Sequence, residues 1–124
     1  MHKLITILLV VVGVIHVLPV VGAVGGARLA ALYGMSFDEP DLAILMRHRA
    51  VLFGLLGVFI VYSAFHPEQQ PLALVAGLVS AGSFLWIAWC VGGYNPAIAR
   101  VVLVDVVAVA CLIAAGGVLI YRDT

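Results

Sequence analysis

The feature that most constrains this chain is a series of four apolar runs, each long enough to cross a bilayer. They cover about residues 4–24, 42–65, 71–92 and 97–121. A helix needs about 20 predominantly apolar residues to span a hydrocarbon core that is roughly 30 Å thick. The chain is 65% hydrophobic and 10% charged, whereas soluble domains average about 45–50% and about 25%. A chain of 124 residues cannot bury that much apolar surface in its own core. We therefore predict an all-α integral membrane four-helix bundle.

The polar breaks between these runs carry signals for helix starts. They are SFDEP (36–40), HPEQQP (66–71) and GGYNP (92–96). Each ends in a proline, which suits the first turn of a helix because that turn has no partner for its N–H groups. Asn95 precedes Pro96 and is a favourable N-cap. The whole chain, residues 1–124, is therefore predicted to be a single transmembrane domain.

The first connection, roughly residues 25–41, is the only long one. Within it, GARLAALYG (26–34) predicts one or two helical turns that end at Gly34. Arg28 and Tyr33 suit a segment that lies along the membrane surface. We therefore expect a short interfacial helix in this first loop.

Polar side chains from all four spans are predicted to meet at one depth. They are His16, Arg47, His48, Arg49, Ser83 and Asp105. Each lies seven to nine residues from the end of its span on the side of the first and third loops, which is roughly 10–13 Å into the membrane. Trp86 lies beside this level and is a candidate wall of a pocket. These residues are our predicted ligand site.

Arg47 is predicted to point into the bundle because it continues a stripe of mostly small residues. That stripe is Arg47, Ala50, Gly54, Gly57, Val61 and Ala64. Membrane helices pack through small residues, and an isolated charge near the bilayer centre costs roughly 2.5–3.5 kcal/mol. We therefore expect Asp105 to pair with Arg47, with Arg49 as the second candidate. For these ionisable groups, a structural ion pair and contact with a ligand both stay open.

Several segments resemble small bacterial membrane proteins of the DoxX-like kind. The segments are HVLPVVGAVGGARLAALYG (16–34), PDLAILMRHRAVLFGLLG (40–57), AGLVSAGSFLWIAW (76–89) and VGGYNPAIARVVLVDVVA (91–108). Within that kind, the chain is most similar to a set of about this length that carries the name phosphopantetheine adenylyltransferase. The resemblance implies a multi-pass four-helix bundle in a bacterial inner membrane.

The enzyme name of that set has no counterpart in the residues. Phosphopantetheine adenylyltransferases are soluble α/β proteins with an H-x-G-H or T-x-G-H phosphate motif, and neither motif occurs in this chain. The chain also has no P-loop for ATP, and it has no carboxylate cluster for magnesium at the level of the predicted pocket. We therefore assign no catalytic residues and lean against an enzyme.

The sequence leaves three functions open. The first is a pocket for an amphipathic or anionic molecule, such as a lipid headgroup or a quinone-like compound, in contact with membrane lipids. The second is an interaction subunit or homo-oligomer, in which the charges form an internal clasp and Gly13, Gly22 and Gly26 offer close helix contacts. The third and weakest is axial haem ligation by His16 and His48.

The residues predict neither a metal or further cofactor nor nucleic acid as a partner. We expect no other cofactor and no metal, because the two cysteines match no metal or redox spacing. The formal net charge is zero, and no basic run occurs. Nucleic acid is therefore not an expected partner.

Overall fold

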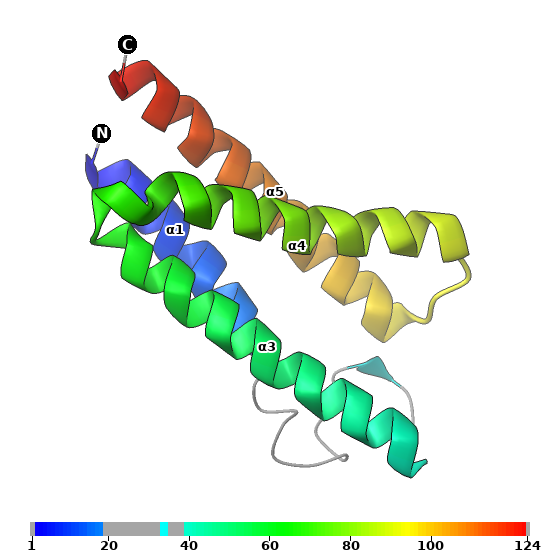
Figure 1. The fold of residues 1–124 in the computed structure, drawn as a ribbon. Coiled ribbons are helices and arrows are strands. Elements are labelled where there is room, and N and C mark those ends of the chain that lie inside the picture. Colours follow the sequence, from blue (N-terminus) through cyan, green and yellow to red (C-terminus); the bar gives the residue numbers. More distant parts are fainter. Residues whose placement is uncertain (1, 19–32, 35–38, 124) are drawn as a thin grey trace.

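The described part of the chain is a bundle of four helices. A computed structural model describes residues 2–18, 33–34 and 39–123. The elements are α1 (His2–Val17), α3 (Pro40–Ala64), the short 3₁₀ helix η2 (Pro67–Gln69), α4 (Gln70–Val91) and α5 (Pro96–Asp123). Within these ranges the regular structure is entirely helical (Figure 1). The predicted all-α four-helix class is thereby confirmed.

Three stretches are long and apolar enough to cross a membrane: Pro40–Ala64, Pro67–Val91 and Pro96–Arg122. Within the first predicted span the structure has an apolar helix over Lys3–Val17. Residues 19–24 of that span lie outside the described residues. So does most of the predicted interfacial helix. Gly34 is described and has a φ of +66°, the left-handed conformation that the predicted helix end requires.

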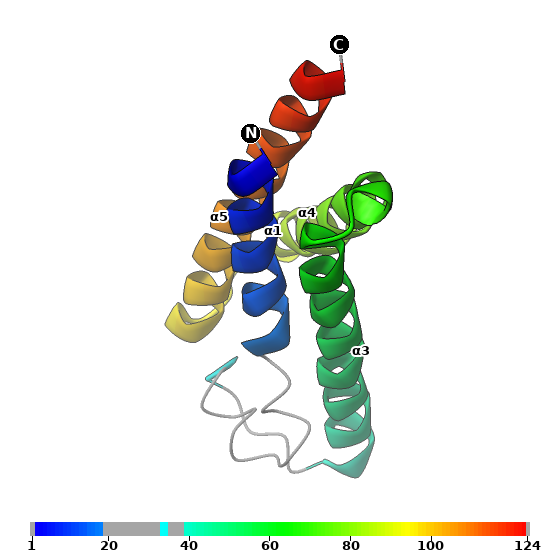
Figure 2. The ribbon, with the colours of Figure 1, turned by 90° about the vertical axis from the view of Figure 1, so that its left-hand side faces the viewer.

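The helices diverge from one end of the molecule. Both chain termini and the turn between α3 and α4 lie at that end, and α3 and α4 separate as they leave the turn (Figure 1). A view along the perpendicular direction shows α1 between α5 and α3 (Figure 2). α1 packs most extensively against α3 and also contacts α5, while α4 packs mainly against α5. The bundle is therefore closed at one end and more open towards the first and third loops.

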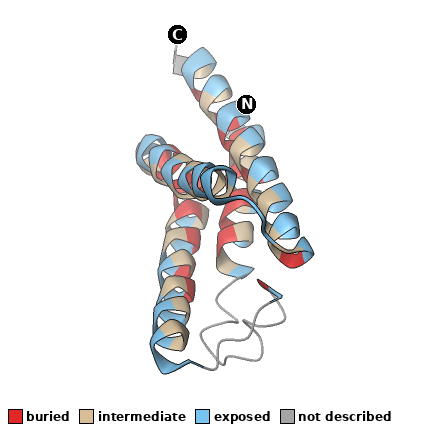
Figure 3. Ribbon diagram, turned by 90° about the vertical axis from the view of Figure 1, so that its right-hand side faces the viewer, coloured by how far each residue is buried: buried red, intermediate tan, exposed pale blue. Residues whose placement is uncertain are grey.

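The closed end holds the core. Its largest fully buried apolar side chains are Ile5, Leu9, Val12, Ile60 and Leu112. These residues form the inner faces of α1, α3 and α5, which Figure 3 colours by burial. The polar residues of interest lie on the next turns, towards the end where the helices diverge.

Glycine allows α1 and α3 to approach closely. A Cβ atom at Gly57 would lie 2.6 Å from Val17 Cγ2 and 2.7 Å from the carbonyl oxygen of Gly13. The predicted small stripe on α3 is therefore a real packing face, and its members Ala50, Gly54, Gly57 and Ala64 are buried. Gly13 belongs to this contact within the chain, whereas Gly22 and Gly26 lie outside the described residues.

Asn95 caps α5 and also holds the first loop. Its Oδ1 accepts a hydrogen bond of 2.8 Å from the Ile98 N–H, as the predicted N-cap requires. Its Nδ2 donates to the Tyr33 carbonyl at 2.9 Å and to the Gly34 carbonyl at 3.3 Å. This second role was not predicted, and it fixes Tyr33 near the open end of the bundle.

Candidate functional site

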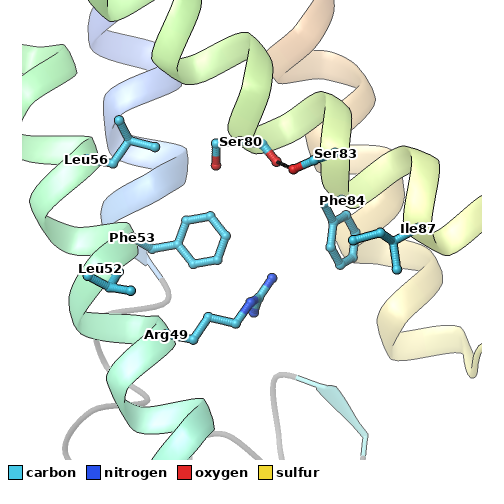
Figure 4. Close-up of a pocket in the computed structure, with 8 residues that line it drawn as sticks. All are labelled: Arg49, Leu52, Phe53, Leu56, Ser80, Ser83, Phe84 and Ile87. Atoms are coloured by element: carbon cyan, nitrogen blue, oxygen red, sulfur yellow. Dashed lines mark hydrogen bonds between the residues drawn. The ribbon is translucent and has the colours of Figure 1, made fainter.

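An apolar cavity of about 320 Å³ lies between α3 and α4, where the two helices diverge. Its lining is drawn in Figure 4 and consists of Arg49, Leu52, Phe53 and Leu56 from α3 and Ser80, Ser83, Phe84 and Ile87 from α4. Both sets follow the spacing i, i+3, i+4, i+7, which is one face of a helix. We call this the outer cavity. Each of the two helices therefore lines the outer cavity with residues from one continuous face.

Arg49 is the charged residue of the outer cavity. Its side chain projects from α3 towards α4 (Figure 4). Its guanidinium carbon lies 4.5 Å from the ring centre of Phe53, 5.5 Å from that of Tyr33 and 5.7 Å from that of Phe84. Aromatic faces stabilise a cation at such distances. The guanidinium is therefore held in an aromatic setting between membrane helices.

Most hydrogen-bond donors of Arg49 have no acceptor among the described residues. Its Nη1 donates to the Tyr33 hydroxyl at 2.5 Å. Among the described residues this is its one hydrogen-bond partner, whereas a guanidinium carries five N–H donors. Arg49 can therefore donate to a further acceptor in the cavity.

A second, smaller cavity of about 30 Å³ lies on the other side of Arg49. Its lining is Ile15, His16, Tyr33, Arg49, Phe53, Val101 and Asp105. We call this the inner cavity. It shares Arg49 and Phe53 with the outer cavity and has room for a water molecule, which needs about 10–15 Å³ of this kind of volume. Arg49 thus lies between the apolar outer cavity and a small cavity that His16 and Asp105 line.

Asp105 faces Arg49 from α5. Its carboxylate is half-buried, lines the inner cavity and interacts electrostatically with the Arg49 guanidinium. No described residue donates a hydrogen bond to it. The two charges therefore act on each other across the inner cavity without a direct hydrogen bond.

His16 links α1 to α4 at the same level. It is 3% exposed, with Nδ1 lying 2.9 Å from the Val12 carbonyl oxygen and Nε2 lying 3.3 Å from Ser80 Oγ. A carbonyl only accepts, so Nδ1 carries the hydrogen, and the neutral ring accepts the Ser80 hydroxyl at Nε2. Both nitrogens are thus engaged within the chain, and this arrangement gives the haem alternative no support.

The predicted inward position of Arg47 is wrong. Arg47 is exposed, whereas Arg49, the second candidate, lines both cavities and is the charge that acts on Asp105. The small stripe faces α1, and Gly57 is already level with Val17, the last residue of that helix. Arg47 lies ten residues before Gly57, about 15 Å further along α3. Arg47 therefore lies beyond the end of α1.

Of the other predicted site residues, some line a cavity and others do not. Ser83 lines the outer cavity, and its hydroxyl donates to the Ser80 carbonyl at 3.0 Å. His48 is exposed, and Trp86 is 69% exposed and lines neither cavity. Phe53 and Phe84 were not among the predicted site residues. The signal that could have found them is the i, i+3, i+4, i+7 repeat that begins at Arg49 and recurs at Ser80.

The fold and site together define an α-helical membrane protein with a cavity between two spanning helices and a guanidinium at its polar end. Comparisons of the chain with family models, with curated proteins and with solved structures found no match. The function must therefore be argued from the site itself.

Proposed function

We propose that this protein binds, within a bacterial inner membrane, an amphipathic molecule whose head is anionic or carries a hydrogen-bond-accepting carbonyl. A lipid headgroup and a quinone-like compound both have that chemistry. The single observation that carries the proposal is the position of Arg49, whose guanidinium projects into an apolar cavity between helices of membrane length. The inner-membrane setting follows from the resemblance to DoxX-like proteins.

The energetics favour a ligand at this guanidinium. A charged side chain at membrane depth costs roughly 2.5–3.5 kcal/mol even on insertion scales. Asp105 and three aromatic rings offset part of that cost. The N–H donors that remain would gain further from a carboxylate, phosphate or carbonyl oxygen, because hydrogen bonds from a charged donor are about twice as strong as neutral ones.

The outer cavity suits the apolar part of such a molecule. Leu52, Leu56 and Ile87 line it with hydrocarbon, and Phe53 and Phe84 add aromatic surface. Its volume of about 320 Å³ falls within the range of about 300–1,000 Å³ found for small-molecule sites. A head at Arg49 and a chain among these residues would match the polarity of the cavity.

A second candidate is that the charges are only a structural clasp in an interaction subunit or homo-oligomer. One observation favours it: the interaction between Arg49 and Asp105 joins α3 to α5, and these two helices make little other contact. The two candidates differ in what must fill the outer cavity, and that difference can be tested.

The test compares molecules that co-purify with matched arginine variants. Wild type, Arg49→Gln and Arg47→Gln are purified in mild detergent, and organic extracts are analysed by mass spectrometry per mole of protein. We expect an amphipathic species with wild type and with Arg47→Gln, the control on the same helix, but not with Arg49→Gln. Equal amounts of every species in all three proteins, or no bound species in wild type, would contradict the proposal.

A cavity-filling variant separates the ligand from the clasp. Ser83→Leu enlarges an outer-cavity side chain on α4 and leaves Arg49 and Asp105 unchanged. Ligand binding predicts that this variant loses the co-purifying species while its helicity and elution volume stay those of wild type. If the charges are only a clasp, Ser83→Leu and wild type will have the same extract.

A further inference from the structure

We infer that the head of the ligand carries a single negative charge, as a carboxylate does, and that its binding at Arg49 takes up one proton at Asp105. This inference rests on the proposed function and specifies the ligand class and its regulation. The observation behind it is that Arg49 lines two cavities at once. The ligand reaches the guanidinium from the outer cavity, and Asp105 faces it from the inner one.

The charges around Arg49 decide what the site can accept. Asp105 on α5 faces it with a carboxylate, His16 on α1 with a neutral imidazole in the observed hydrogen bonds, and Tyr33 with a hydroxyl. From α4 the neighbours are the uncharged Ser80 and Ser83. Arg47 and His48, on the same helix as Arg49, are exposed. Counted over the described residues, the site is therefore neutral overall when Arg49 and Asp105 are both charged.

An anion added to this neutral site leaves a net charge of −1 between helices of membrane length. An unbalanced charge in a poorly solvated setting is strongly unfavourable, and proteins usually avoid it by changing a protonation state. One proton on Asp105 restores neutrality for a singly charged head. A doubly charged head, such as a phosphate monoester, would leave a negative charge even then. Charge balance therefore selects a monoanion.

Asp105 is the group that accepts the proton with the least disruption. No described residue donates a hydrogen bond to its carboxylate, so protonation breaks none. A proton on His16 would instead occupy Nε2 and remove the hydrogen bond that this nitrogen accepts from Ser80. It would also leave Asp105 charged beside the incoming anion.

The sign of the pH dependence follows from linkage. Binding that takes up a proton is stronger at low pH and weakens as Asp105 ionises, by up to about tenfold per pH unit for one proton. The probe is a long-chain alkyl sulfonate with a nitroxide on its chain, because a sulfonate head stays charged throughout. Its immobilised fraction is measured by electron paramagnetic resonance in proteoliposomes of zwitterionic lipid, between about pH 5.5 and 8.5.

The expected result is immobilisation by wild type that increases as pH falls. Asp105→Asn should bind the sulfonate at every pH at least as tightly as wild type does at low pH, with no slope. His16→Gln should keep the slope. An alkyl phosphate of the same chain length should bind less tightly than the sulfonate at high pH. A wild type that binds without pH dependence, a slope retained in Asp105→Asn, or tighter binding of the phosphate overturns the inference.

A measurement on unmodified protein makes the inference independent of how the variants fold. Sulfonate is added to wild type in weakly buffered detergent solution with a pH indicator, and proton uptake is counted per bound probe across the same range. We expect uptake that approaches one proton at high pH, and none at any pH would refute the inference. A probe that wild type never immobilises, or immobilises no better than Arg49→Gln, would also refute the inference, because the site would then not bind a monoanion; the proposed function is decided separately, by the co-purification test.

Discussion

The close contact between α1 and α3 makes a quantitative prediction about Gly57. In Gly57→Ala the new methyl carbon would lie 2.6 Å from Val17 Cγ2, 2.7 Å from the Gly13 carbonyl oxygen and 2.9 Å from the Val17 amide nitrogen. Two of these three atoms belong to the backbone, so a side-chain rotation cannot relieve the clash. The helices must move apart instead.

The cost can be separated from helix propensity by a matched control. Overpacking of this kind costs about 1–3 kcal/mol, whereas replacing a mid-helix glycine by alanine gains about 1 kcal/mol. Gly116 lies inside α5, and a Cβ atom there would meet nothing within 4 Å. Gly116→Ala should therefore show the gain alone, and Gly57→Ala should be about 1–3 kcal/mol less stable than Gly116→Ala.

The assay is unfolding in mixed micelles of a mild detergent and sodium dodecyl sulfate, followed by far-ultraviolet circular dichroism. The free energies of unfolding of wild type and the two variants are compared at one protein concentration. If Gly57→Ala is stabilised as much as Gly116→Ala, the close packing of α1 on α3 is not present in the protein, and the positions of His16 and Arg49 derived from it fail as well.

Three further changes test the polar contacts. Asn95→Ala should lower the free energy of unfolding by about 2 kcal/mol or more, through loss of the cap and of the bonds to the first loop. Asn95→Asp should cost less because its carboxylate keeps the cap; equal costs would contradict the cap, and no cost for Asn95→Asp would contradict the second role. Tyr33→Phe should destabilise the protein by about 1.5–3 kcal/mol, since it removes the hydroxyl that accepts a hydrogen bond from the charged Arg49 guanidinium. The same unfolding assay would show no change if Arg49 lay elsewhere. Nitrogen NMR of neutral His16 should show the hydrogen on Nδ1, and Ser80→Ala should shift the Nε2 resonance; a hydrogen on Nε2 would rule out the assigned bond.

Much of the fold could be predicted because it depends on local signals. The apolar runs and the prolines at 40, 71 and 96 gave helix starts within one or two residues of Pro40, Gln70 and Pro96. The small stripe on α3 also gave its packing face. Such signals need no knowledge of which helix lies next to which.

The site could be predicted only in part. Depth along a helix follows from residue number, and of the residues predicted at one depth the structure has His16, Arg49, Ser83 and Asp105 in the lining of the two cavities. Direction around the helix depends on neighbours. Arg47 would point into the bundle only if one face of α3 were turned inward along the whole length of the helix, and in the structure Arg47 is exposed.

The sequence by itself determined that this chain is a helical membrane protein with a few ionisable groups at one depth, because apolar length and helical rise are properties of each segment alone. Only the tertiary structure decided that α3 and α4 diverge, that their facing stripes line an open cavity, and that Arg49 is the charge between that cavity and Asp105. The physical reason is that separation and rotation of helices are set by contacts between distant residues, such as Gly13 with Gly57 and Asn95 with Tyr33.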